Sequence, residues 1–298
     1  MRWIRSPMWD SVWLLSGLPI GLMLMAFPLS AVLTLFFVLN TAHVISPMAV
    51  AWGHGEFRRL AMKRAVRFIL IPVSILLAAT ALGVTVGKEF HVNLATLTVL
   101  VDDPADYMRP FVWLLPVYFV WNLYHFGAQN FGLVSLYRRG WRSSRRRAIW
   151  KWSIVAVTVI GMEVTKLILW GFEATGHVYH GTIGVPKYWH LPAVSMFIFG
   201  FFAVNHSLVA IGLSSHVLAR HYARPPLLCA AALIIAGAFG FWLLFCAPGL
   251  AVRMSMTAVG FRIGLGFVHF IYDRWIWKLS DPQVRAAIGR DLFPGSAV

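Results

Sequence analysis

The chain has 298 residues, of which 59% are hydrophobic and only 12% are charged. A soluble domain of this length carries about a quarter charged residues, so this composition, with a mean hydropathy of +0.71, excludes an ordinary soluble globular protein. The formal charge of +15 does not indicate nucleic-acid binding, because the basic residues fall in short loops beside hydrophobic segments, where they contact anionic lipid headgroups.

Hydrophobic segments of membrane-spanning length follow one another along the chain. They are about twenty residues long and do not alternate polar and apolar residues, which favours helices over a β-barrel. We therefore expect an all-α, polytopic membrane helical bundle that forms one domain over residues 1–279, with a cytoplasmic tail over residues 280–298. The eight expected spans cover residues 9–27, 29–52, 67–87, 110–137, 152–172, 191–219, 226–247 and 250–279.

The charges of the loops predict the orientation of these spans. Arginine and lysine cluster after the second, fourth, sixth and eighth spans, whereas the loop after the third span holds Glu89, Asp102, Asp103 and Asp106. Positive charge stays on the cytoplasmic side. We therefore expect a multi-pass protein of a bacterial-type inner (cell) membrane with both termini in the cytoplasm.

Two stretches are neither spans nor simple turns. Residues 90–101 are apolar but too short to cross, so we expect an amphipathic helix along the outer interface. In the polar tail, Asp281-Pro282 predicts that one helix stops and another begins. The tail is expected to cap the cytoplasmic face or to be partly disordered.

Four histidines lie deep in different spans. They are His43, His125, His206 and His269, in the second, fourth, sixth and eighth spans, all of which run inward. Each lies roughly 13–20 Å from the cytoplasmic end of its span, at about 1.5 Å per residue. Histidines that serve only packing have no reason to agree in both direction and depth. Neutral imidazole is a good ligand for iron, zinc and copper, so the pattern predicts a metal site inside the bundle. The alternative is that each imidazole simply hydrogen-bonds between helices.

Other polar side chains lie near these histidines along the helices. A residue four positions after a ligand lies on the same helical face and could ligate the metal or orient an imidazole. His54 follows His43 by about three turns, nearly on the same face. Such neighbours, as further ligands or as groups that orient the ligands, are Gln129, Asp273, His54 and His216.

Charged residues also occur deep within two spans. Glu163 and Lys166 lie three residues apart in the fifth span, and Arg262 lies in the eighth. An unpaired ion at that depth is very costly. We expect a buried charge network with a structural role, and a proton relay is the alternative.

Short motifs resemble a known family. Tyr124-His125-Phe126-Gly127-Ala128-Gln129-Asn130-Phe131 resembles the His-Phe-Gly-x-x-Asp-Phe stretch of the bacterial beta-carotene dioxygenase family, often called the Brp/Blh family. Asn205-His206-Ser207 is similar to its His-Ser stretch, and His269 to Asp273 to its late His-to-Asp segment. The resemblance implies a polytopic membrane enzyme that holds iron with histidines and cleaves an isoprenoid. The early Gly-Leu-Pro-His-Gly motif of that family is absent here, and Ala210 stands where the family has a second histidine.

These observations lead to a functional hypothesis with alternatives. We expect a histidine-coordinated, iron-dependent membrane oxidoreductase or oxygenase that takes a lipid-like or isoprenoid-like apolar substrate from the bilayer. Membrane lipids and a redox partner are the other expected partners, and nucleic acid is not. Another transition metal remains open as the cofactor, and so does b-type haem in an electron-transfer protein. A transporter coupled to protons or metal ions, and a scaffold subunit without metal, are the remaining alternatives.

Overall fold

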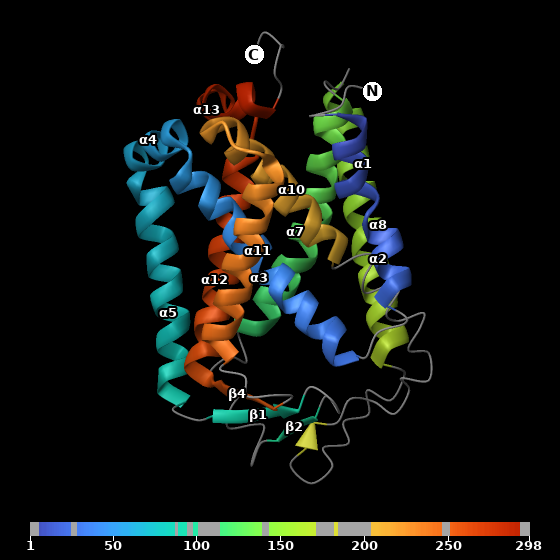
Figure 1. Ribbon diagram of the computed structural model, residues 1–298, viewed down its shortest axis with the longest axis vertical. Helices are drawn as coiled ribbons and strands as arrows, with labels where there is room; N and C mark the ends of the chain where they lie inside the picture. The colour runs from blue at the N-terminus through green and yellow to red at the C-terminus, as the bar shows by residue number, and fades with distance from the viewer. Residues whose placement is uncertain are drawn as a thin grey trace.

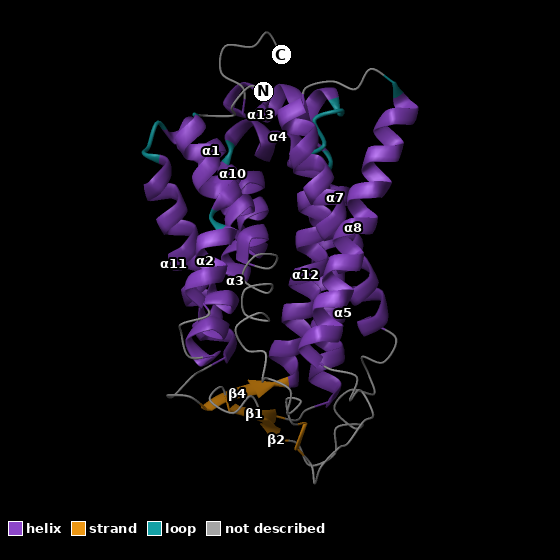
Figure 2. Cartoon of the chain, turned by 90° about the vertical axis from the view of Figure 1, so that its right-hand side faces the viewer, coloured by secondary structure: helices purple, strands orange, loops and turns teal. Residues whose placement is uncertain are grey.

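In the computed structural model the chain folds into a helical bundle with a small antiparallel sheet at one end (Figure 1). The structure describes residues 6–24, 29–86, 89–93, 98–100, 114–138, 143–170, 182–183, 204–245 and 251–292. Most described residues are helical, as the composition predicts. Helices α4 and α13 lie at the end of the bundle opposite the sheet, and α1 lies toward that same end (Figures 1 and 2).

Three helical segments among the described residues are long and apolar enough to cross a membrane. They cover Thr34–Gly53, Val66–Val86 and Pro226–Leu243. They belong to α3 (Leu29–Gly53), to α5 (Ile71–Val86) with the turn before it, and to α11 (Pro226–Phe245). Their length and composition indicate association with a membrane.

The first expected span is divided in the structure. Residues Pro7–Leu15 form α1 and Gly17–Leu24 form α2, with Ser16 in a turn between them. Glycine lets this pair approach α10 (Asn205–Tyr222) closely, because a Cβ at Gly212 would lie 2.5 Å from the Trp13 ring. The amide of Gly17 donates to the Asn205 side chain at 3.1 Å. The division of this span therefore fixes the first turn of α10.

Tight packing also joins α5 to α12 (Met256–Ile276). A Cβ at Gly83 would lie 2.2 Å from the carbonyl oxygen of Met256, and one at Gly260 would lie 2.3 Å from that of Ala79. Only glycine permits backbones to approach this closely. On its other sides α12 contacts α3 and α7 (Leu114–Arg138), and α7 packs against α8 (Ser144–Trp170).

The expected interfacial helix at residues 90–101 is wrong. Glu89–Asn93 form strand β1 and Thr98–Leu100 form β2, which pair with each other in antiparallel fashion. Strand β4 (Ala251–Ser255) pairs with β1, and β3 (Thr182–Ile183) completes the order β3-β2-β1-β4. The stretch is rich in valine and threonine, which favour strands, and β4 supplies backbone partners. The eighth expected span therefore begins as a strand, and its helix starts at Met256.

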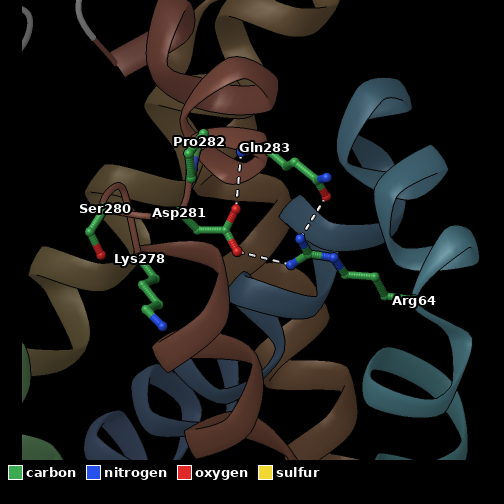
Figure 3. Close-up of a pocket in the computed structure, with 6 residues that line it drawn as sticks. All are labelled: Arg64, Lys278, Ser280, Asp281, Pro282 and Gln283. Carbon is green, nitrogen blue, oxygen red and sulfur yellow. Dashed lines mark hydrogen bonds and ion pairs between the residues drawn. The ribbon is translucent and has the colours of Figure 1, made fainter.

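The opposite end is closed by α4 (Gly55–Lys63), by a π-helical turn at Val66–Leu70 and by α13 (Pro282–Leu292). The predicted helix stop and restart at Asp281-Pro282 is confirmed, since Asp281 accepts the Gln283 amide at 3.0 Å and Pro282 begins α13. Arg64 donates to Asp281 at 2.9 Å and to the Gln283 side chain at 2.6 Å (Figure 3). These hydrogen bonds lower the pKa of Asp281 below its ordinary value. The buried side chains of α13 extend the main hydrophobic core: Val284, Ala287, Ile288 and Leu292.

Candidate metal centre

Four buried imidazoles meet inside the bundle, each from a different helix. His43 comes from α3, His125 from α7, His206 from the first turn of α10 and His269 from α12. Their exposed fractions are 2%, 7%, 7% and 1%. The structure thus brings together the four histidines that the sequence places at one depth in spans of the same predicted direction.

The rings lie close enough to share one ligand. The centre of the His43 ring is 4.6 Å from that of His206 and 4.3 Å from that of His269. The His125 ring is 5.8 Å from His206 and 5.0 Å from His269. Nitrogen atoms about 2.0–2.1 Å from a metal ion place the centres of two ligating imidazoles about 4.5–5.5 Å apart. Two of the four observed distances, 4.6 and 5.0 Å, fall within this range, and the other two, 4.3 and 5.8 Å, lie within about 0.3 Å of it, so small shifts of the rings would let them share a metal ion.

Several ring nitrogens in this cluster lack partners. Nε2 of His269 lies 3.2 Å from Nε2 of His125, so without a ligand one nitrogen donates to the other, whereas a metal ion between them would take the lone pair of both. Among the described residues, Nδ1 of His43, Nε2 of His206 and Nδ1 of His269 are buried without a hydrogen-bond partner. Buried polar atoms are normally paired, and such orphaned nitrogens call for a ligand.

Asp273 adds a carboxylate to the cluster. It lies one turn after His269 on α12 and is 4% exposed. Its Oδ1 accepts the indole N–H of Trp277 at 2.8 Å, while its Oδ2 lies 3.7 Å from Nε2 of His125. Two sets of possible metal ligands result, and both contain His125. In each set, one nitrogen or oxygen atom from every residue lies within 4.8 Å of those of the others. The two sets are His43, His125 and His206, and His125, His269 and Asp273.

The backbone of α3 is adapted around His43. Pro47 has no N–H, so the carbonyl of His43 loses its helical donor four residues later. The Ser46 hydroxyl donates to that carbonyl at 2.9 Å instead. The proline is therefore accommodated one turn after His43 without leaving the His43 carbonyl unsatisfied.

Aromatic side chains enclose the imidazoles. The Phe126 ring stacks on His206 with centres 3.8 Å apart, and the Phe270 ring lies 4.7 Å from His125. Tyr118 packs against Phe270 at 5.7 Å and thereby extends this wall along α7 and α12. These rings exclude water from one side of the cluster and present apolar surface beside it.

Gln129 and Asp273 lie where the helical spacing predicts, but His54 and His216 do not join the cluster. The side chain of Gln129 lies beside the His125 ring. His216 instead lines a small cavity of about 20 Å³ with Asp10, Trp13 and Leu133. His54 lies eleven residues after His43, about 16 Å along the helix axis, so it is too far away to join the cluster; α3 also ends at Gly53, just before it.

His54 belongs to a second polar cluster with His221 and Asp291, which caps α4. Nδ1 of His54 accepts the amide of Phe57 at 3.3 Å, and Nε2 of His221 accepts that of Gly55 at 3.1 Å. Nε2 of His54 lies 2.7 Å from Asp291 on α13 and must donate to it. Burial and then the nearby His54 lower the pKa of His221. Although the three side chains lie close enough to hold an ion, their hydrogen bonds already fix both tautomers, so we assign this cluster a capping role.

The expected charge network falls partly outside the described residues. The side chains of Glu163 and Lys166, on α8, are not among those described. Arg262 donates to the Asn40 side chain, one turn before His43 on α3.

Sequence reasoning missed the two groups that position the ligands. Trp277 lies one turn after Asp273, so the same spacing that linked His269 to Asp273 would have found it. The Asn205 contact with Gly17 joins residues far apart in the chain, and no local pattern predicts it.

Comparison of the chain with protein-family models, with curated proteins and with solved structures found no match.

Proposed function

We propose that this protein is a membrane oxidoreductase, of the oxygenase type, that holds iron with His43, His125, His206 and His269 and acts on an apolar substrate from the bilayer. The observation that carries this proposal is the meeting of four buried imidazoles, three of which, His43, His206 and His269, keep a buried ring nitrogen without a hydrogen-bond partner among the described residues. A scaffold whose histidines only bridge helices would be expected to satisfy these nitrogens within the protein.

Iron is favoured over other metals by the composition of the ligand set. Asp273 could join the four imidazoles as an additional ligand; with His125 and His269 it makes two imidazoles and one carboxylate, the combination found in non-haem iron oxygenases. When bound, iron would supply the redox chemistry that oxygenation needs. The protein's own contribution is then to orient Asp273 through Trp277 and to exclude water with Phe126 and Phe270.

The same geometry disfavours haem. Two axial imidazoles must leave a flat slot between them for the macrocycle, whereas the His43 ring centre lies only 4.3 and 4.6 Å from those of two neighbours. The visible absorption spectrum of purified protein tests this alternative, because a strong Soret band would replace the non-haem proposal with b-type haem.

The membrane arrangement is the second part of the proposal. The alternation of basic and acidic loops supports eight membrane spans with both termini in the cytoplasm of a bacterial-type inner membrane. Helices α4 and α13 would then face the cytoplasm and the sheet would face outward. A site buried among membrane helices receives a lipid-like or isoprenoid-like substrate directly from the bilayer. A monooxygenase of this kind would also need two electrons per turnover from a redox partner, whereas a dioxygenase would take none from outside the substrate.

Metal analysis of detergent-purified protein tests the site. We expect stoichiometric iron in the wild type after supply of Fe²⁺ and its loss in His125→Ala. The matched control is His216→Ala, which removes an equally buried imidazole outside the cluster and should retain iron. Absence of metal from the wild type, or equal metal content in all three proteins, would contradict the proposal. Size-exclusion profiles confirm that each variant is folded.

A further inference from the structure

Arg262 is a cation inside the bundle on the same side of α12 as His269. The two residues are seven positions apart, two helical turns or about 10 Å along the axis. One guanidinium nitrogen, Nη2, donates to Oδ1 of Asn40, which lies nearly one turn before His43 on α3. Its charge acts on the rings of both His43 and His269. Arg262 therefore lies one to two turns from the histidine cluster, toward the end of the bundle that carries the sheet.

The hydrogen bonding of this guanidinium is incomplete. Its Nη1 is buried and has no hydrogen-bond partner among the residues that the structure describes. No ion pair involves Arg262 within that part of the chain, and its one described partner is a neutral amide. A buried charge with a free donor is expensive, and in a membrane helix it indicates a functional group that awaits an acceptor.

The chemistry of guanidinium defines that acceptor. Its planar fork of N–H groups matches the oxygens of a carboxylate or phosphate, and hydrogen bonds to such anions are about twice as strong as neutral ones. The side chain as a whole is only partly buried, whereas its free Nη1 is buried, so the acceptor must enter the bundle to meet it. An anion at this position would have its attached hydrocarbon chain within reach of the apolar wall around the histidines.

We propose that Arg262 binds the anionic headgroup of an amphiphile, a carboxylate or phosphate on a hydrocarbon chain, and so holds the chain beside the histidine cluster. That the amphiphile is a substrate rests on the proposed function, whereas its binding does not. The competing structural role is an internal pair between Arg262 and the carboxylate of Glu163, which would neutralise the guanidinium without any ligand.

The test measures binding to metal-free protein in nanodiscs of neutral lipid. Tritiated oleate is the probe, and unlabelled oleate, oleyl phosphate and oleyl alcohol compete for it. We expect the two anions to bind about tenfold or more tightly than the alcohol, and their order identifies the headgroup. Arg262→Gln should abolish this preference, and Arg262→Lys should keep part of it. Arg274→Gln, on the exposed end of the same helix, should leave it unchanged.

Three outcomes would overturn the proposal. The wild type could bind oleate no better than oleyl alcohol, or Arg262→Gln could retain the preference while remaining folded by size exclusion. In the third, only Glu163→Gln would show the preference, which would identify an internal ion pair. Because no metal or turnover is involved, these results do not depend on the iron analysis. A protein that binds no iron could still bind oleate through Arg262, and a protein that binds iron could show no preference for oleate.

Discussion

The two oxygens of Asp273 face different groups. The indole of Trp277 holds Oδ1, which turns Oδ2 toward His125. Residues that orient a metal ligand typically change metal affinity by 10–100-fold. If Asp273 contacts the proposed iron, this hydrogen bond within one helix sets the direction from which it does so.

Replacement of Trp277 by phenylalanine tests that dependence. Phenylalanine keeps an aromatic ring but has no N–H, so Asp273 loses its orientation. We expect iron affinity to fall by about 10–100-fold, measured by competition with a chelator. Trp275→Phe is the matched control, since Trp275 lies 3.9 Å beneath Arg67 and is not the donor to Asp273. Equal losses in both variants would show that Trp277 acts only by packing.

At the scale of elements, two histidines cap the start of α4. Nδ1 of His54 and Nε2 of His221 accept amides of its first turn, and Asp291 ties His54 to α13. An imidazolium has no lone pair to accept these amides, and its charge is unfavourable at a helix N-terminus. The junction between α4 and α13 therefore depends on pH.

The direction of that dependence follows from the pKa of His221. It lies below its ordinary value in the folded protein, so below about pH 6.5 the unfolded chain binds a proton that the folded chain does not. The stabilisation is complete above about pH 6.5 and declines as the pH falls toward the folded pKa.

We expect the thermal midpoint to drop between about pH 7.5 and 5.5. In His221→Gln, whose amide oxygen accepts a hydrogen bond without titrating in this range, the drop should be smaller. The same drop in both proteins would refute the role of His221. The lowered pKa of Asp281 does not interfere, because that stabilisation is lost only as the pH falls below the ordinary aspartate range.

The contact between α5 and α12 can be tested by adding one methyl group. In Gly260→Ala the new Cβ would lie 2.3 Å from the Ala79 carbonyl oxygen, so α12 must shift and move His269 with it. Such overpacking costs about 1–3 kcal/mol. We expect a lower thermal midpoint and weaker iron binding. Gly132→Ala on α7 is the control, because nothing lies within 4 Å of its new Cβ, and it should be at least as stable as the wild type. If Gly260→Ala has the same thermal midpoint and iron affinity as Gly132→Ala, the close approach of α5 and α12 at Gly260 is not needed for stability or for the position of His269.

For the whole molecule, basic residues gather at one end of the bundle, and the sheet lies at the other end. Helix α1 lies toward the end of the bundle that α4 and α13 close, and the sheet lies at the other (Figure 1). The basic residues after the second and eighth expected spans fall at that closed end, whereas the acidic loop after the third span follows the strand Thr98–Leu100 of the sheet. This polarity is the one that the positive-inside rule requires.

Reporter fusions in a bacterial host test the orientation. Green fluorescent protein attached after Val298 should fluoresce, because it folds in the cytoplasm. Alkaline phosphatase, which needs an oxidising compartment, should be active after Asp103 and inactive after Arg142. Activity after both positions, or after Arg142 alone, would invalidate the proposed topology.

The sequence by itself determined the class of the protein and most of the candidate site. Composition indicated a membrane helical bundle, and the predicted direction and depth of their spans singled out His43, His125, His206 and His269, whose rings the structure brings together. Helical spacing also selected Asp273. These features could be predicted because they are local or depend on composition, and helical periodicity is read along one segment.

Only the tertiary structure decided what depends on contacts between segments. It brought the four rings within reach of one another, paired residues 89–93 with residues 251–255 as strands, and ended α3 at Gly53, so that His54 caps the start of α4 with His221. The rotation of each helix about its axis sets these contacts, and packing at glycines such as Gly83, Gly212 and Gly260 fixes that rotation. Periodicity shows which residues share a helical face, but only packing between helices determines what that face contacts.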